Sequence, residues 1–369
     1  MLALSRNDLD PSLVFIAYLA LIASILTLRA LSAPHRLARP AKQEGIELIA
    51  ANFGALIATW LTTNQLAAAA PVFLLSINAA AITRYMVDRL SMPGILWLTA
   101  SGAGVLVGTL WMSLFILESG LPGPMMVAAF AVLGLSVVGV IITQIATFPR
   151  EAVLTHERWR LPSDPPVGAP APRLKVSLQL PCYAEPPEVV IATMNRLAAL
   201  DYDNYEVLVC DNNTKDEALW RPLEAHCRVL NARLGEERFR FFHVSPLPGA
   251  KAGALNYLLD HMAPDAELIG VIDADYYARP DFLSRLVPFF ADPEIGYVQT
   301  PHDYRDYEDN AYLTASYWEY MPTNKVDYPG VSEYGGAFTI GTMCILRTEA
   351  LRKAGGWAEW CLTEDSEVS

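Results

Sequence analysis

Long apolar runs without charge dominate residues 1–149, whereas shorter apolar runs separated by polar clusters fill the rest of the chain. An α-helix rises 1.5 Å per residue, so about 20 apolar residues cross the roughly 30 Å hydrocarbon core of a bilayer. The runs therefore predict an all-α bundle of about five transmembrane helices, at residues 11–28, 46–63, 66–83, 93–117 and 124–148. The polar pair Asn64-Gln65 divides the second run from the third. The alternative is that both runs form one long tilted helix, in which case the bundle has four spans.

The basic residues of the short connecting segments predict an orientation for this bundle. With five spans, one side of the bilayer carries only Arg6, and the other side carries Arg29, Arg36, Arg39, Lys42, Arg84, Arg89, Arg150, Arg158 and Arg160. Loops rich in Lys and Arg remain in the cytosol. We therefore expect an outside amino terminus, a cytosolic linker at residues 150–172 and a cytosolic domain after it.

Residues 173–369 alternate between short apolar runs and amphipathic or polar segments, which predicts an α/β domain with a mostly parallel, doubly wound sheet. The expected strands cover residues 176–180, 205–210, 239–244, 268–272, 295–300 and 343–346. The expected helices cover residues 187–200, 216–233, 251–261 and 348–354. Ligands of such sheets bind at the carboxyl ends of the strands, where the strand order reverses.

The charge balance excludes one class of partner. The chain has 27 Lys and Arg against 40 Asp and Glu, a formal net charge of −13, and most of the acidic residues follow residue 149. Nucleic-acid phosphates need a basic face, so we expect no nucleic-acid partner. The five cysteines show no C-x-x-C spacing, which favours reduced thiols over a metal site or a disulfide framework.

Candidate chemistry gathers at the predicted strand ends. Asp273 and Asp275 follow the apolar run 268–272 and are one residue apart, so their side chains can converge on a hard divalent cation, Mg2+ or Mn2+. Further polar residues end the first two strands and begin a helix: Tyr183, Glu185, Asp211 and Lys251. Such a set suits a nucleotide diphosphate, with the cation on the diphosphate and Lys251 where a helix start favours anions.

Several short motifs, in this order and spacing, resemble the processive, membrane-integrated family 2 glycosyltransferases, which include cellulose, β-glucan, chitin and hyaluronan synthases. They are Pro181 to Glu185, Asp211, Lys251-Ala-Gly-Ala-Leu-Asn256, Asp273-Ala-Asp275, Val298-Gln-Thr-Pro301 and Thr363-Glu-Asp365. The resemblance covers about residues 173–369. It implies a GT-A-type glycosyltransferase domain, Rossmann-like, adjoining membrane spans in a bacterial-type inner (plasma) membrane.

The resemblance also implies roles for individual residues. Asp211 and Glu185 would hold the uridine, together with Tyr183. Asp273 and Asp275 would serve the nucleotide and the metal, and Lys251 would lie near the phosphates. Asp365 would be the general base on the acceptor hydroxyl, which an inverting transfer requires. The acceptor side would include Gly341, Thr342 and Glu364.

Two departures from the family pattern bear on the acceptor. The acceptor-side loop, often Phe-Cys-Gly-Ser in the family, reads Thr339-Ile-Gly-Thr342 here. The family's Gln-x-x-Arg-Trp motif, expected some tens of residues after Asp365, lies outside the 369 residues. The expectation is a C-terminally incomplete domain that binds UDP but does not polymerise by itself.

The expected activity is transfer of glucose from UDP-glucose, with inversion, to a growing β-glucan at the cytosolic face of the membrane. Its partners would be a UDP-sugar donor, a polysaccharide acceptor and the lipid bilayer. One alternative is a UDP-GlcNAc-using enzyme of the chitin or hyaluronan type. Another is a non-catalytic protein that binds a nucleotide sugar and regulates a partner synthase.

Overall fold

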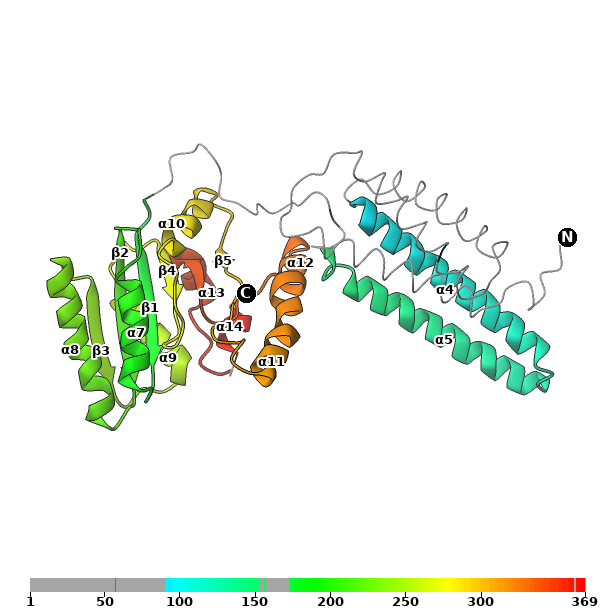
Figure 1. Ribbon diagram of the computed structural model, residues 1–369, viewed down its shortest axis with the longest axis horizontal. Coiled ribbons are helices and arrows are strands. Elements are labelled where there is room, and N and C mark those ends of the chain that lie inside the picture. Colours follow the sequence, from blue (N-terminus) through cyan, green and yellow to red (C-terminus); the bar gives the residue numbers. More distant parts are fainter. Residues whose placement is uncertain (1–56, 58–89, 153–155, 157–172, 362, 369) are drawn as a thin grey trace. The chain divides into compact units, whose positions relative to one another are not determined.

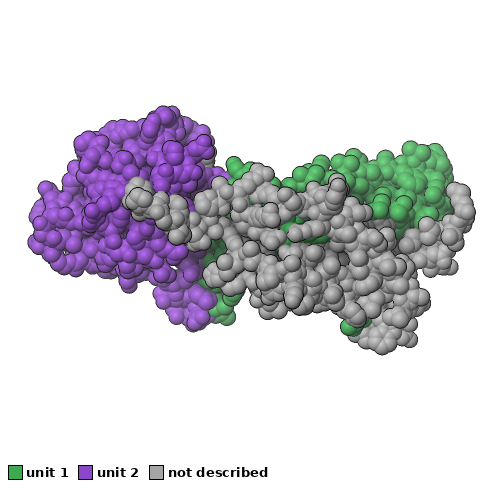
Figure 2. Space-filling model, turned by 90° about the horizontal axis from the view of Figure 1, so that it is seen from above, with its two compact units in different colours: residues 1–161, 311–336 green, residues 162–310, 337–369 purple. Residues whose placement is uncertain are grey.

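A computed structural model describes residues 57, 90–152, 156, 173–361 and 363–368 (Figure 1). The predicted spans at 11–28, 46–63 and 66–83, and most of the predicted linker, lie outside these residues. The chain forms two compact units, residues 1–161 with 311–336 and residues 162–310 with 337–369 (Figure 2). Segment 311–336, predicted to belong to the α/β domain, thus groups with the apolar helices.

Two helices of the first unit match predicted spans. They are α4 (Met92–Glu118) and α5 (Gly123–Thr147). Ser91 caps α4 through its side chain, which accepts a hydrogen bond from the Gly94 amide. In the described part of the chain, these two are the helices long and apolar enough to cross a bilayer. The helices predicted at 93–117 and 124–148 are therefore confirmed as helices; that they cross a membrane remains a prediction, as does the five-span bundle.

The first unit also contains α11 (Ala311–Pro322), a π-helical turn (Thr323–Asp327) and α12 (Tyr328–Glu333). Close packing joins α12 to the segment after α5. A Cβ added at Gly330 would lie 2.4 Å from the Arg150 carbonyl oxygen, so only glycine fits there. Next to it, the His156 ring and the Tyr334 hydroxyl share a hydrogen bond of 2.6 Å.

The second unit contains a six-stranded sheet, which confirms the predicted α/β class with mostly parallel strands. Its order is β3-β2-β1-β4-β6-β5, and β3, β2, β1 and β4 run parallel. Strand β6 is antiparallel to both β4 and β5. The strands are β1 (Val176–Cys182), β2 (Tyr205–Asn212), β3 (Phe239–Val244), β4 (Leu268–Val271), β5 (Tyr297–Gln299) and β6 (Cys344–Arg347).

Helices lie at the four predicted positions, and the structure adds a short helix and a 3-10 turn between β4 and β5. They are α7 (Pro187–Leu197), α8 (Glu217–Leu234), α9 (Ala250–His261), α10 (Phe282–Leu286), a 3-10 turn (Val287–Ala291), α13 (Thr348–Ala354) and α14 (Glu364–Glu367). Each end of α8 has its expected cap, since the Asp216 side chain accepts the Ala218 amide and Gly235 adopts a left-handed φ of 73°.

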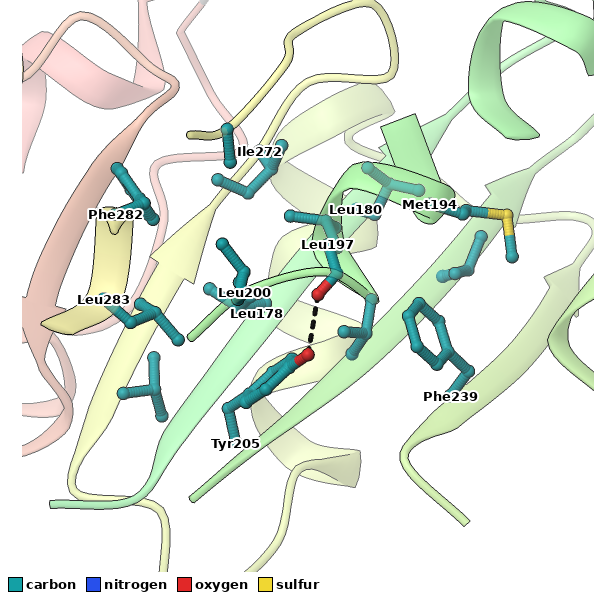
Figure 3. Packing of buried hydrophobic residues seen from close by; sticks show 14 of the residues in the cluster. Leu178, Leu180, Met194, Leu197, Leu200, Tyr205, Phe239, Ile272, Phe282 and Leu283 are labelled. Carbon is teal, nitrogen blue, oxygen red and sulfur yellow. Dashed lines mark hydrogen bonds between the residues drawn. The ribbon is translucent and has the colours of Figure 1, made fainter. Parts of the chain in front are cut away.

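Apolar side chains fill both faces of the sheet. One cluster joins β1, β2 and β4 to α7, α8 and α10, and Figure 3 shows part of it, with the Tyr205 hydroxyl donating to the Leu197 carbonyl at 2.6 Å. The other cluster joins β2, β4 and β6 to α9 and Trp357. In the sheet itself, a Cβ at Gly270 would lie 2.5 Å from Leu178 Cδ2, so the glycine leaves room for the Leu178 side chain on this face. This rigid sheet holds the strand-end residues described next.

Candidate functional site

Asp273 lies just beyond the carboxyl end of β4, at the centre of the sheet. The backbone N–H of Asp273 donates to the Thr342 hydroxyl at 2.9 Å, and Thr342 immediately precedes the turn into β6. Farther back, the Met343 amide donates to the Val271 carbonyl at 2.8 Å. The antiparallel strand β6 thereby brings the segment 339–343 against the Asp-x-Asp turn, although about 70 residues separate the two in sequence.

Lys251 connects the groups around Asp273. It lies in the first turn of α9, and its Nζ is 2.6 Å from Asp273 Oδ1. The same Nζ donates to the Gly341 carbonyl at 2.9 Å and is 4.0 Å from Glu364 Oε1. One ammonium group thus contacts the donor-side carboxylate and two acceptor-side residues predicted from the sequence.

Asp365 lies against the same loop. Gly341 has a left-handed φ of 73°, and a Cβ added there would be 2.8 Å from Asp365 Oδ2. The Thr339 hydroxyl donates to the Asp365 carbonyl at 2.7 Å, which ties the start of α14 to the loop. The predicted base and the predicted acceptor-side residues are therefore brought together around Lys251 and Asp273.

The ends of β1 and β2 form a second group. The Tyr183 backbone N–H donates to the Glu185 carboxylate, while the Tyr183 side chain is exposed. Asp211 is buried, and both of its carboxylate oxygens have partners: Oδ1 is 2.8 Å from His243 Nδ1, and Oδ2 accepts the Thr214 hydroxyl at 2.6 Å. A nucleoside that contacts Asp211 would have to share it with these two residues.

Sequence reasoning missed several of these partners. His243 is the penultimate residue of β3 and stacks on Trp220, with ring centroids 4.3 Å apart. Near Asp273, His302 Nδ1 is 3.2 Å from the Tyr276 hydroxyl. Gln299, inside a motif that the sequence did single out, donates to the Thr342 carbonyl at 2.9 Å and accepts the Ile340 amide at 3.0 Å. The position of His243 near the end of a predicted strand could have been noted, but its contact with the Asp211 carboxylate could not.

Burial dominates the electrostatics of the site. Desolvation raises the pKa of Asp273; Lys251 opposes this effect and the Asp275 carboxylate adds to it. Desolvation also raises the pKa of Glu185, hydrogen bonds from the backbone oppose the shift, and the Asp211 and Asp275 carboxylates add to it. The pKa of His302 is lowered by burial. These mutual effects place Glu185, Asp211, Asp273 and Asp275 in one negatively charged region.

We expect Glu185→Gln to stabilise the fold at neutral pH. A raised folded-state pKa means that the folded chain holds the proton more tightly than the unfolded chain, so ionised Glu185 opposes folding above that pKa. The variant should melt about 1–3 °C higher at pH 7. This advantage should vanish as the pH falls below the ordinary carboxyl pKa, where Glu185 is protonated in both states.

Thermal melting at pH 7 and at pH 4 measures this effect. The matched control is Glu237→Gln, because Glu237 is exposed and lies in the turn before β3. A lower melting temperature for Glu185→Gln at pH 7, or a gain that is equal at both pH values, would contradict the expected effect of burial.

The two carboxylates that follow β4 suit a hard divalent cation whose other ligands are substrate phosphates and water. Among the described residues, no group of three His, Cys, Asp or Glu side chains could enclose a metal. Asp273 and Asp275 provide two carboxylates whose mutual repulsion contributes to the raised pKa of Asp273. Mg2+ commonly binds through one or two carboxylates, substrate phosphates and water. The donor set therefore suits a cation that arrives with a diphosphate.

Comparison with known proteins agrees with this geometry. The model of the family "Glycosyl transferase family 2" matches residues 177–355. A probable glucomannan 4-beta-mannosyltransferase from rice is 27% identical over 199 residues, which are 53% of this chain and 36% of the relative. A beta-monoglucosyldiacylglycerol synthase from Trichormus variabilis is 27% identical over 190 residues, 49% of this chain and 38% of the relative. The match thus spans little more than a third of these curated relatives.

Among solved structures, a mannosyltransferase from Pyrobaculum calidifontis, in complex with GDP-Man and Mn2+, aligns with a TM-score of 0.43 and 22% identity. The alignment covers 57% of this chain and 54% of that chain. The segment that matches this family model, residues 177–355, makes up just under half of the chain and contains the six-stranded, mostly parallel sheet. This segment is therefore similar to family 2 glycosyltransferases and has an α/β fold.

Proposed function

We propose that this domain transfers a hexose, with inversion, from a nucleotide diphosphate sugar to a β-linked glycan at a membrane. The observation that supports the proposal is the convergence of Asp273, Lys251, Gly341 and Asp365 at one edge of the sheet. Lys251, which would bind the diphosphate, and Asp365, which would be the base, both contact the loop that contains Gly341. UDP-glucose as donor and a growing β-glucan as acceptor are the specific substrates that we propose.

The role that we propose for each residue follows from its position in the sheet. Glu185, Asp211 and Tyr183, at the ends of β1 and β2, would hold the nucleoside. Lys251 would turn its ammonium group toward the diphosphate. The Asp365 carboxylate, held over Gly341, would take the proton of the acceptor hydroxyl as the new glycosidic bond forms and the nucleotide diphosphate leaves.

Asp273 and Asp275 would hold the divalent cation. When bound, Mg2+ or Mn2+ supplies positive charge that stabilises the leaving diphosphate. Asp365 would transfer the proton, and the loop from Thr339 to Thr342 would orient the acceptor.

A glycolipid acceptor is the second candidate, because one of the similar proteins is a beta-monoglucosyldiacylglycerol synthase. This synthase and the glucomannan mannosyltransferase are each 27% identical to this chain over about half of its length. Incubation of membranes containing the natural full-length chain with radiolabelled nucleotide sugars separates the two. Label in alcohol-insoluble polymer supports the glycan acceptor, and label in the chloroform extract supports the lipid. Label in neither, with every donor tested, would count against the proposed transferase.

The metal role can be tested by Asp275→Asn. Loss of one of two carboxylates should weaken UDP binding in the presence of Mn2+ by about tenfold or more, because a carboxylate contributes charge that an amide lacks. Isothermal calorimetry with UDP, with and without Mn2+, measures the change. Asp260→Asn, an exposed position on α9, is the control. An unchanged affinity and metal dependence in Asp275→Asn would eliminate its metal role.

A further inference from the structure

Arg305 lies in the loop after β5 and reaches back to the Asp-x-Asp turn. Its Nη2 donates to the backbone carbonyl of Asp275 at 3.0 Å. Its guanidinium carbon lies 3.5 Å from the centroid of the Tyr277 ring. One planar cation therefore holds both the backbone of the second aspartate and the aromatic side chain two residues later.

The two aspartates of the turn are anchored by different parts of the chain. Asp273 is fixed by Thr342, through its amide, and by Lys251, through its carboxylate. Asp275 lies four residues beyond Val271, the last β4 residue that pairs with β6, in the turn itself, and it is exposed. Arg305 supplies the contact that fixes the peptide of this residue.

We propose that Arg305 is a positioning residue. It holds Asp275 in the orientation in which the carboxylates of Asp273 and Asp275 can bind the same cation. This rests on the proposed function, because it assumes a metal–diphosphate ligand at the turn. The Asp275 carbonyl and carboxylate belong to one residue, so fixing the peptide limits the directions that the carboxylate can take. Cation–π contact with Tyr277 keeps the guanidinium plane in place for the hydrogen bond.

The charge of Arg305 contributes as well. The region contains the carboxylates of Glu185, Asp211, Asp273 and Asp275, which repel one another. A guanidinium beside Asp275 offsets part of this repulsion without occupying its side-chain oxygens, because the observed hydrogen bond goes to the backbone carbonyl. Asp275 thus keeps its carboxylate available while its backbone is held.

The structure offers a matched control. Arg196, on α7, also lies over the Tyr277 ring, with its guanidinium carbon 5.4 Å from the centroid. In the described part of the chain, the Asp275 carbonyl bonds to Arg305 and not to Arg196. Arg196→Gln therefore removes a nearby cation of the same type but leaves the proposed anchor intact.

The experiment uses the natural full-length chain in detergent, as wild type, Arg305→Gln, Arg305→Lys and Arg196→Gln. UDP binding is titrated at rising Mn2+ concentrations and also without metal, and the melting temperature of each variant is recorded. We expect Arg305→Gln to raise the Mn2+ concentration for half-maximal UDP binding about tenfold. Metal-free UDP binding and melting temperature should stay close to those of the wild type. Arg305→Lys should be intermediate, because an ammonium group keeps the charge but not the planar stacking.

Electron paramagnetic resonance of Mn2+ in the presence of UDP gives a second readout, since a loosened Asp275 should change the spectrum of the bound ion. Equal Mn2+ requirements in wild type and Arg305→Gln would overturn the proposal. So would an equal loss in Arg196→Gln, or a loss of metal-free binding and melting temperature together. A wild-type chain that binds UDP without any metal dependence overturns the metal role and this inference; one that binds no nucleotide diphosphate overturns the proposed function itself.

Discussion

Replacing Asp365 by Asn is expected to lower the rate of sugar transfer by about 10²–10⁴-fold, the usual contribution of a general base. Asn has nearly the same shape but cannot accept the acceptor proton. The Asp365 carboxylate lies over Gly341, while Lys251 joins the Gly341 carbonyl to Asp273. Loss of the base should therefore lower turnover and leave the affinity for the donor almost unchanged.

Membranes containing the natural full-length chain allow the comparison, with sugar incorporation measured against the affinity for the nucleotide. The matched control is Glu367→Gln, an exposed carboxylate in the same short helix, α14. Asp365→Asn with more than about a tenth of wild-type turnover would refute its role as base. A parallel loss of donor affinity would point instead to a structural role at the loop.

Gly253→Ala is expected to have the largest effect on stability. Gly253 lies in α9, where a Cβ would come within 1.9 Å of the Pro248 carbonyl oxygen and 3.0 Å of its carbonyl carbon. Both are backbone atoms, so the turn that precedes α9 would have to move. We expect a loss of about 3 kcal/mol or more in the free energy of unfolding, at or above the usual range for overpacking.

The same movement should displace Lys251, two residues earlier, and weaken nucleotide binding. Urea denaturation followed by circular dichroism measures the stability change. Gly296→Ala is the control, because the nearest atom to its added Cβ is the Ala350 Cβ at 4.0 Å. Similar free energies of unfolding for Gly253→Ala and Gly296→Ala would show that the turn before α9 can move without loss of stability.

Much of the fold could be predicted because apolar runs and strand-end polar clusters are local patterns. The six strands lie where the sequence predicts them, and their ends differ from the predicted ones by at most two residues. Segment 311–336 was assigned to the α/β domain because it lies between two predicted strands. Its packing against Arg150 through Gly330 depends on a contact between residues 180 positions apart, which no local pattern contains.

The candidate site divides in the same way. Asp273, Lys251, Gly341 and Asp365 were named from motifs, and the structure brings them together. The partners that orient them could not be named. Arg305 sits in a polar loop that resembles any exposed loop, and its link to Asp275 is visible only once the chain has folded back.

The position of β6 in the chain has a consequence for biosynthesis. The four parallel strands end at Val271, whereas β6, which pairs with β4, begins at Cys344. At about 5–20 residues per second, a ribosome needs roughly 4–15 s to make the intervening segment. During that interval one edge of β4 is unpaired, and the Thr342 hydroxyl that accepts the Asp273 amide has not yet been made. A growing chain therefore contains Lys251, Asp273 and Asp275 before it has the loop that contacts Asp365, and we expect stalled products to be incapable of transfer.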